Sequence, residues 1–200
     1  MNGHPQIKRL EYDYITDGIY IGTNQCCQTH FDEKLKQEGI EVDISLEEER
    51  VDAPFGVRFY IWIPIKNHTA PTSEQLDFGV ATIEKLLSLK KKIYVHCQNG
   101  HGRAPTMVAA YLIKKGKSVD EAINFIKAKR PTIHLEEVQK QALLEWSKSN
   151  KTLLAKNFLH SLIKPLRTNR QLFGSQLLGV HHVKLGRKKL RSSIKKWATR

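Results

Sequence analysis

The eight residues from His96 to Arg103, which read His-Cys-Gln-Asn-Gly-His-Gly-Arg, combine the residue types that phosphate chemistry needs. Cys97 is a potential nucleophile, and Arg103 carries a planar fork of N–H groups that can hold two oxygens of one phosphate. Gly100 and Gly102 let the backbone curl so that several of its N–H groups converge on one anion. We predict that Cys97 and Arg103 are the catalytic residues. The predicted phosphate-binding residues are Gln98, Asn99, Gly100, His101, Gly102 and Arg103.

The elements predicted on either side of this loop explain how Cys97 and Arg103 could act on one phosphate. Residues 93–95 (Ile-Tyr-Val) predict a short buried strand before it, and residues 105–115 predict a buried helix after it, with Pro105 in its first turn. The N-terminus of a helix offers unpaired N–H groups to an anion and favours a thiolate over a thiol. A thiolate beneath a bound phosphate can attack in line and form a phosphocysteine that water then hydrolyses. We expect His96 to support the loop through hydrogen bonds. The alternative, a buried cysteine beside a tight turn, leaves the ordered combination of strand, glycines, arginine and helix unexplained.

The rest of the first 150 residues predicts strands that alternate with helices. Strands are expected at residues 19–22 and in two stretches of alternating apolar residues, 42–46 and 59–65. The expected helices cover residues 31–38, 72–87, 105–115, 118–130 and 135–146, and capping boxes mark two of them, at Thr72 and Ser118. This order favours an α/β fold in which helices flank a mainly parallel central sheet.

The positive charge is confined to the end of the chain. The 200 residues carry a formal net charge of +13. Residues 1–150 hold 20 Lys and Arg against 20 Asp and Glu, whereas residues 151–200 hold 13 Lys and Arg and no acidic residue. We therefore predict a phosphatase domain at residues 1–150 and a basic amphipathic tail at residues 151–200. Such a tail is able to bind an anionic membrane surface or a nucleic-acid backbone, or to pack on its own domain.

The cysteines and the apolar stretches exclude several classes of protein. Cys26, Cys27 and Cys97 form neither a disulfide framework nor a spaced pair of zinc ligands, so we predict no metal and no cofactor. Cys26 and Cys27 are interpreted as structural thiols, with a redox partner for Cys97 as the alternative. The first ten residues lack a signal peptide's apolar run, and no stretch is long enough for a transmembrane segment. A cytoplasmic protein is expected, with peripheral membrane contact through the tail as one of the alternatives left open above.

Residues 96–103 resemble the signature His-Cys-x-x-Gly-x-x-Arg of protein tyrosine and dual-specificity phosphatases. The resemblance extends to residues 14–22, which are similar to the opening strand of the dual-specificity group, and to residues 35–46, similar to its next helix and strand. Arg130-Pro131 resembles a late helix boundary of the family, so the similarity covers about residues 12–148. It implies the family's fold and a cysteine-dependent phosphatase acting on phosphate monoesters, with phosphoproteins as the expected substrates.

The sequence departs from the family pattern at two positions. The Asp that protonates the leaving oxygen is replaced by Asn67, and the neighbouring His68 is the alternative acid because histidine titrates near neutral pH. Ala104 stands where the family usually carries a Ser or Thr that helps the thiolate leave. These departures keep open the alternative of a weakly active or inactive phosphate-binding protein. A phospholipid or phosphoinositide phosphatase is a further alternative, because the loop recognises phosphate and the surrounding walls select the rest of the substrate. Sulfur transfer on a rhodanese-like loop fits the arginine fork less well.

Overall fold

The structure, a computed structural model, describes residues 9–150, which form a five-stranded sheet covered by helices on both faces. The strands are β1 (Tyr12–Thr16), β2 (Ile19–Gly22), β3 (Ile40–Glu47), β4 (Phe59–Ile65) and β5 (Lys92–His96). Their order is β1-β2-β5-β3-β4, and every neighbouring pair is parallel except β1 and β2. The predicted fold class is confirmed. The basic tail predicted at residues 151–200 lies outside the described residues.

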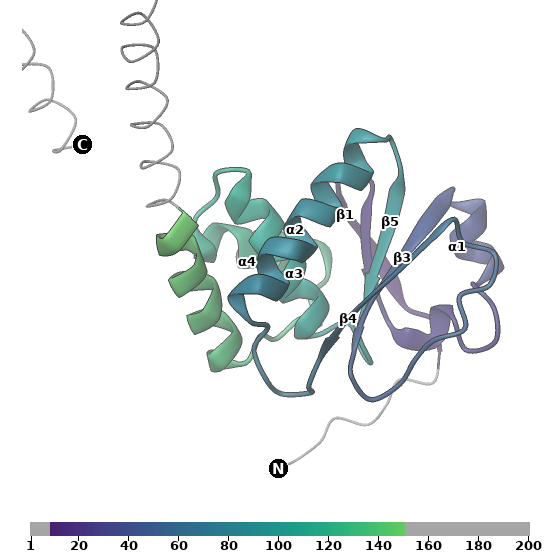
Figure 1. Ribbon diagram of the computed structural model, residues 1–200, viewed down its shortest axis with the longest axis horizontal. Coiled ribbons are helices and arrows are strands. Elements are labelled where there is room, and N and C mark those ends of the chain that lie inside the picture. The colour runs from purple at the N-terminus through teal and green to yellow at the C-terminus, as the bar shows by residue number, and fades with distance from the viewer. Residues whose placement is uncertain (1–8, 151–200) are drawn as a thin grey trace, which may run out of the picture. The chain divides into compact units, whose positions relative to one another are not determined.

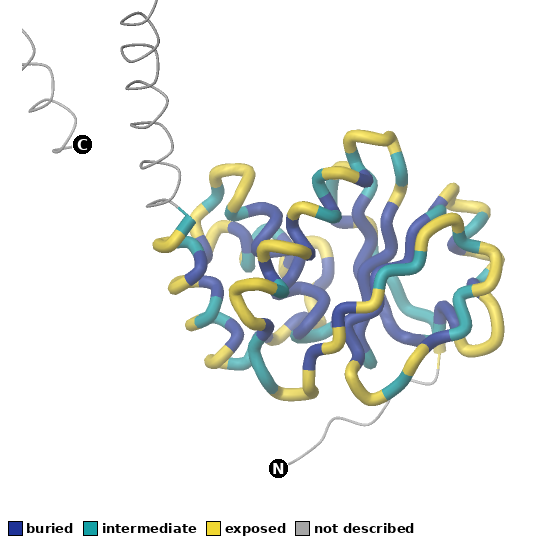
Figure 2. The backbone as a smooth tube through the Cα atoms, viewed as in Figure 1, coloured by how far each residue is buried: buried dark blue, intermediate teal, exposed yellow. Residues whose placement is uncertain are grey.

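Three helices, α2 (Ser73–Ser88), α3 (Arg103–Lys114) and α4 (Val119–Lys129), lie on one side of the sheet, and α1 (Glu33–Gln37) lies on the other (Figure 1). A further helix begins at residue 137. The larger core cluster joins β-strand residues such as Ile44 and Val95 to α2, α3 and α4. A smaller cluster around Tyr94 and Phe31 fills the α1 side. Figure 2 shows the central strands buried along most of their length.

Local signals place several element boundaries. Both predicted capping boxes form, because Thr72 and Ser118 accept hydrogen bonds from the backbone N–H groups of Gln75 and Glu121. The helix expected at residues 31–38 is shorter, because Asp32 caps it by accepting from Lys34 N. The final helix begins at residue 137 instead of 135. Within residues 9–150, no helix combines the length and apolar character needed to cross a membrane.

The polar residues that alternate with apolar ones along β3 are buried, although the sequence pattern predicts that they face solvent. Apolar residues alternating with polar ones are typical of a strand with one solvated face. Here Asp43 and Ser45 are both 0% exposed, because β3 lies between β5 and β4 and both faces of the sheet are covered. The sheet therefore buries a set of polar side chains that require partners.

The close packing of α2 on α3 depends on Gly79. A Cβ atom at this position would lie 2.3 Å from Sδ and 2.6 Å from Cε of Met107. We expect Gly79→Ala to lower the free energy of unfolding by about 1–3 kcal/mol through overpacking, measured by urea denaturation. Ala81→Ser, at an exposed site on the same helix, is the control and should change it by less than about 0.5 kcal/mol. Stabilisation by Gly79→Ala, which helix propensity alone predicts, would contradict this packing.

Candidate active site

The loop between β5 and α3 has its carbonyl groups turned away from its concave side. The carbonyl of Gln98 accepts from Asn24 N (3.2 Å), that of His101 from His134 N (3.0 Å), and that of Gly102 from Thr106 N (2.9 Å). In a trans peptide the N–H of the next residue points opposite to the carbonyl, and the described chain has no cis peptide. Tethering the carbonyls outward therefore turns the intervening N–H groups inward.

Arg130 holds two further carbonyls of this loop, so that all five from residue 98 to residue 102 are bonded. Its Nε donates to the Gly100 carbonyl (3.1 Å) and its Nη2 to the Asn99 carbonyl (3.1 Å), while Nη1 is paired with Asp13 Oδ2 (2.6 Å). The Arg130 side chain is only 3% exposed. Sequence analysis identified Arg130 only as a helix boundary, because nothing local indicates that its side chain reaches back to the loop.

Gly100 is needed where the loop approaches β2. It has a φ of +67°, and a Cβ atom there would lie 2.5 Å from the Gly22 carbonyl oxygen. Both the left-handed conformation and the close approach favour glycine. The predicted role of Gly100 in curling the loop thus has a specific geometric cause.

A pocket of about 80 Å³ lies at the concave side of the loop. It is lined by the predicted residues Cys97, Gln98, Asn99, His101, Gly102 and Arg103, and also by Asn67, His68, His134, Glu136 and Gln139. Cys97 is 3% exposed at its floor. The structure thus brings the predicted nucleophile, arginine and acid-loop residues to one pocket.

Arg103 is positioned by contacts through a single nitrogen. Its Nη1 donates to the Ile65 carbonyl (2.7 Å) and to Glu49 Oε2 (2.7 Å). Within residues 9–150 the hydrogen bonds found for this guanidinium all use Nη1, so its Nε and Nη2 edge remains available for two phosphate oxygens. Although partial burial opposes ionisation, the contact with Arg103 holds the pKa of Glu49 below its ordinary value.

Glu49 also links Arg103 to the loop that carries the candidate acids. Its Oε1 accepts from the backbone N–H of Asn67 (2.8 Å). The side-chain oxygen of Asn67 accepts in turn from His68 N (3.1 Å), so this amide is used to shape its own loop. His68 has a φ of +60°, and its Nδ1 lies 2.9 Å from Glu136 Oε1. Sequence analysis missed Glu49 and Glu136, which lie far from the loop in sequence.

The hydroxyl nearest to the departure at Ala104 does not replace the missing one. Ala104 is 0% exposed, and the Thr106 hydroxyl donates to the Gly102 carbonyl at 2.8 Å. This bond runs back along the first turn of α3. The Thr106 hydroxyl is therefore engaged by the carbonyl four residues earlier in the chain and serves the start of the helix.

The prediction that His96 supports the loop through hydrogen bonds needs correction. Its Nε2 faces Asp43 Oδ1 (3.2 Å) and Cys27 Sγ (3.6 Å), and its Nδ1 has no hydrogen-bond partner in the described chain. Side chains alternate across a strand, so the residue before Cys97 points to the opposite side of the sheet. Burial opposes protonation of His96, but Asp43 and Cys27 raise the pKa of its imidazole well above the ordinary value.

Comparisons with known proteins agree with this geometry. The dual specificity phosphatase catalytic domain family matches residues 19–149. A human phosphatidylglycerophosphatase and protein-tyrosine phosphatase 1 is 43% identical over 79 residues, covering 39% of each chain. An Arabidopsis thaliana phosphatidylglycerophosphate phosphatase is 31% identical over 102 residues, covering 50% of this chain and 45% of the relative. These matches span less than half the length of either relative.

Solved structures share the fold. The crystal structure of PTPMT1 has a TM-score of 0.61 at 27% identity and covers 73% of this chain and 99% of its own. That of human DUSP28 has a TM-score of 0.65 at 16% identity and covers 70% of this chain and 99% of its own. The family match spans most of the described residues and includes the whole loop from Cys97 to Arg103. The chain therefore belongs to the dual-specificity phosphatase family through this catalytic domain.

Proposed function

We propose that this protein hydrolyses phosphate monoesters through a phosphocysteine formed on Cys97. The observation that carries the proposal is the orientation of the loop, whose carbonyls from residue 98 to residue 102 are all tethered outward. The inward N–H groups and the Nε/Nη2 edge of Arg103 supply donors to the equatorial oxygens of a phosphoryl group. Cys97 lies at the floor of the same pocket, where its sulfur can attack phosphorus in line.

The proton for the leaving oxygen is proposed to come from His68. The Asn67 amide is not an acid, and its oxygen is occupied by the His68 backbone N–H. His68 lines the pocket, and its Nδ1 lies 2.9 Å from Glu136 Oε1, which fixes the orientation of the ring. With Nδ1–H given to Glu136, the proton to be transferred is the one on Nε2.

Two substrate classes fit this site. Phosphoproteins are the substrates expected from the sequence, and a phosphoryl pocket of this kind accepts any accessible monoester. Phospholipid monoesters are the second candidate, supported by the Arabidopsis thaliana relative named a phosphatidylglycerophosphate phosphatase and by the human relative, whose name gives both a phosphatidylglycerophosphatase and a protein-tyrosine phosphatase. Comparing rates on phosphotyrosine and phosphothreonine peptides with rates on vesicles containing phosphatidylglycerophosphate separates the two classes.

The nucleophile and the arginine are tested with an aryl phosphate. Cys97→Ser should abolish turnover of para-nitrophenyl phosphate while retaining the fold. Arg103→Lys should lower kcat/KM by at least about 100-fold, because a point charge cannot replace the bidentate fork. Arg58→Lys is the matched control, because Arg58 is exposed and its ion pair among residues 9–150 is with Glu41, away from the pocket. Activity retained in Cys97→Ser would rule out the cysteine mechanism. Activity retained in Arg103→Lys would show that Arg103 does not bind the phosphoryl group through a bidentate contact.

The positioning role of Arg130 predicts a loss of anion binding. Arg130→Lys removes at least two of the three bonds that hold Asn99, Gly100 and Asp13, so the carbonyls can turn inward. We expect the Kd for inorganic phosphate to rise by about 10- to 100-fold, measured by calorimetry well below Tm, with kcat/KM falling in parallel. A lower Tm with unchanged phosphate affinity would mean that Arg130 serves only the stability of the domain.

The acid is tested by comparing a good and a poor leaving group. His68→Ala should slow hydrolysis of an alkyl phosphate by about 10² to 10⁴-fold and remove the alkaline limb of its pH profile. Its effect on para-nitrophenyl phosphate should be small, because that leaving group is stable as an anion. Asn67→Asp should change little. A large gain from Asn67→Asp on the alkyl phosphate, with no effect of His68→Ala, would assign the acid position to residue 67.

A further inference from the structure

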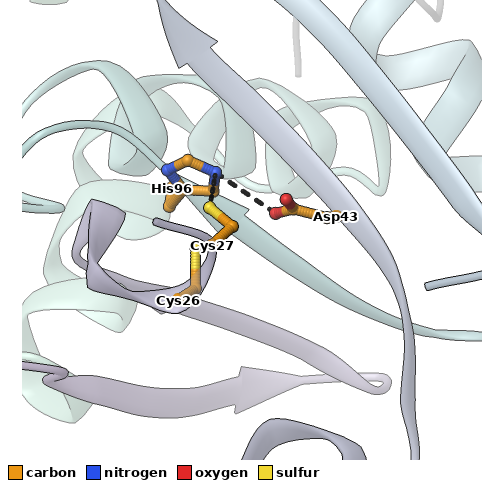
Figure 3. A group of neighbouring side chains, drawn as sticks. All are labelled: Cys26, Cys27, Asp43 and His96. Atoms are coloured by element: carbon orange, nitrogen blue, oxygen red, sulfur yellow. Dashed lines mark hydrogen bonds and ion pairs between the residues drawn. The ribbon is translucent and has the colours of Figure 1, made fainter. Parts of the chain in front are cut away.

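Four potential metal ligands meet beneath the phosphate loop, on the α1 side of the sheet. They are Cys26 and Cys27 in and just after the short 3-10 turn η1 (Asn24–Cys26), Asp43 on β3 and His96 at the end of β5 (Figure 3). All four residues are 0% exposed, and one ligand atom from each lies within 4.8 Å of the others. The catalytic mechanism uses none of these side chains.

The distances in this cluster match the edges of a tetrahedral zinc site. Zn–N and Zn–O bonds of about 2.0 Å and Zn–S bonds of about 2.3 Å give an N···O edge of about 3.3 Å and an N···S edge of about 3.5 Å. In the cluster, His96 Nε2 lies 3.2 Å from Asp43 Oδ1 and 3.6 Å from Cys27 Sγ. Two ligand pairs thus stand at the length of a tetrahedral edge, and all four ligand atoms lie within 4.8 Å of one another.

Three buried polar atoms of the cluster, both Asp43 carboxylate oxygens and His96 Nδ1, have no hydrogen-bond partner among the described residues. Neither carboxylate oxygen of Asp43 accepts a hydrogen bond of good geometry from the described residues, although Nε2 of His96 lies close to it. A buried carboxylate without such partners is costly unless a cation lies beside it. Burial, with Cys27 and Asp43 next in importance, raises the pKa of the Cys26 thiol well above its ordinary value. The cation beside Asp43 is either a protonated His96, whose Nε2 lies 3.2 Å away, or a bound metal ion.

We propose that Cys26, Cys27, Asp43 and His96 bind one Zn²⁺ ion in a closed structural site. Two sulfurs, one imidazole nitrogen and one carboxylate oxygen complete a tetrahedral set of the kind that a borderline-soft ion such as Zn²⁺ accepts. Binding releases the thiol protons of both cysteines and leaves the Nε2 lone pair of His96 on the metal. The prediction that no metal binds rested on adjacent cysteines without spaced partners, and the fold supplies those partners from β3 and β5.

Neighbouring groups support such an ion. Asp52 Oδ2 lies 3.5 Å from His96 Nε2 and also accepts no hydrogen bond from the described residues, while the other oxygen of Asp52 is held by Arg50. Outer-shell carboxylates usually accept from the ring nitrogen that is not on the metal, whereas Asp52 lies beside Nε2, so its contribution is the negative charge that it places next to the proposed cation. Because all four first ligands come from the protein and are buried, the site has no open position for a substrate, and we assign it to stability. It joins η1, β3 and β5 directly below Cys97.

Cobalt(II) titration of the full chain, purified free of metal under reducing conditions, tests the site. Tetrahedral cobalt bound by thiolates gives charge-transfer bands in the near ultraviolet, which histidine and carboxylate ligands do not. We expect one Co²⁺ per chain with these bands, displaced by one equivalent of Zn²⁺, and a higher Tm with Zn²⁺. Cys97→Ser is the matched control and should keep the bands, because Cys26, Cys27 and Cys97 are the chain's three cysteines.

Two variants of the cluster make the proposal falsifiable. Cys27→Ser should lose most of the charge-transfer intensity and the gain in Tm. Asp43→Asn keeps the shape and volume of the side chain but removes its charge. Loss of an outer-shell partner costs about 10- to 100-fold in metal affinity, and we expect this variant to weaken Co²⁺ binding by more than that. Folding of each variant is checked by circular dichroism. Absence of the bands in the unmodified chain overturns the proposal, as does their loss in Cys97→Ser or their full retention in a folded Cys27→Ser.

Discussion

The active site depends on one constraint, the outward tethering of the loop carbonyls between Cys97 and Arg103. Peptide groups have a carbonyl on one side and an N–H on the other, so a loop can present donors to an anion only if its acceptors are satisfied elsewhere. Backbone N–H groups of residues 24, 106 and 134 satisfy three of these carbonyls, and Arg130 satisfies two. The loop is thus joined to η1, to the first turn of α3 and to the segment that begins at the C-cap of α4.

The parts of the site that are local in sequence were predictable, and the parts that depend on tertiary contacts were not. A strand, two glycines, an arginine and a helix start within about a dozen residues indicate an anion loop directly. Arg130 and Glu49 touch this loop from 30 and 54 residues away, and no periodicity or capping rule connects them to it. The same limit hid the second role of His96, because strand alternation alone does not reveal that Cys27 and Asp43 lie on its far side.

The two halves of the proposed reaction are supported unequally by the chain. The attack on phosphorus has its nucleophile, its arginine and its inward donors in one pocket. The second half has an alanine at residue 104 and a Thr106 hydroxyl bound to the Gly102 carbonyl, so no side-chain hydroxyl of α3's first turn is free to assist the departing thiolate. The account therefore implies that hydrolysis of the phosphocysteine is slow compared with its formation, a condition under which the intermediate accumulates.

Mass spectrometry of acid-quenched enzyme tests the central claim most directly. The full chain is mixed with para-nitrophenyl phosphate, quenched within the first turnovers, digested and analysed for phosphorylated peptides. We expect one phosphoryl group on the peptide that contains Cys97, appearing together with a burst of para-nitrophenol and absent from the Cys97→Ser variant. Turnover with no phosphoryl group on that peptide, or with the group on a histidine of the loop, would contradict a mechanism through Cys97.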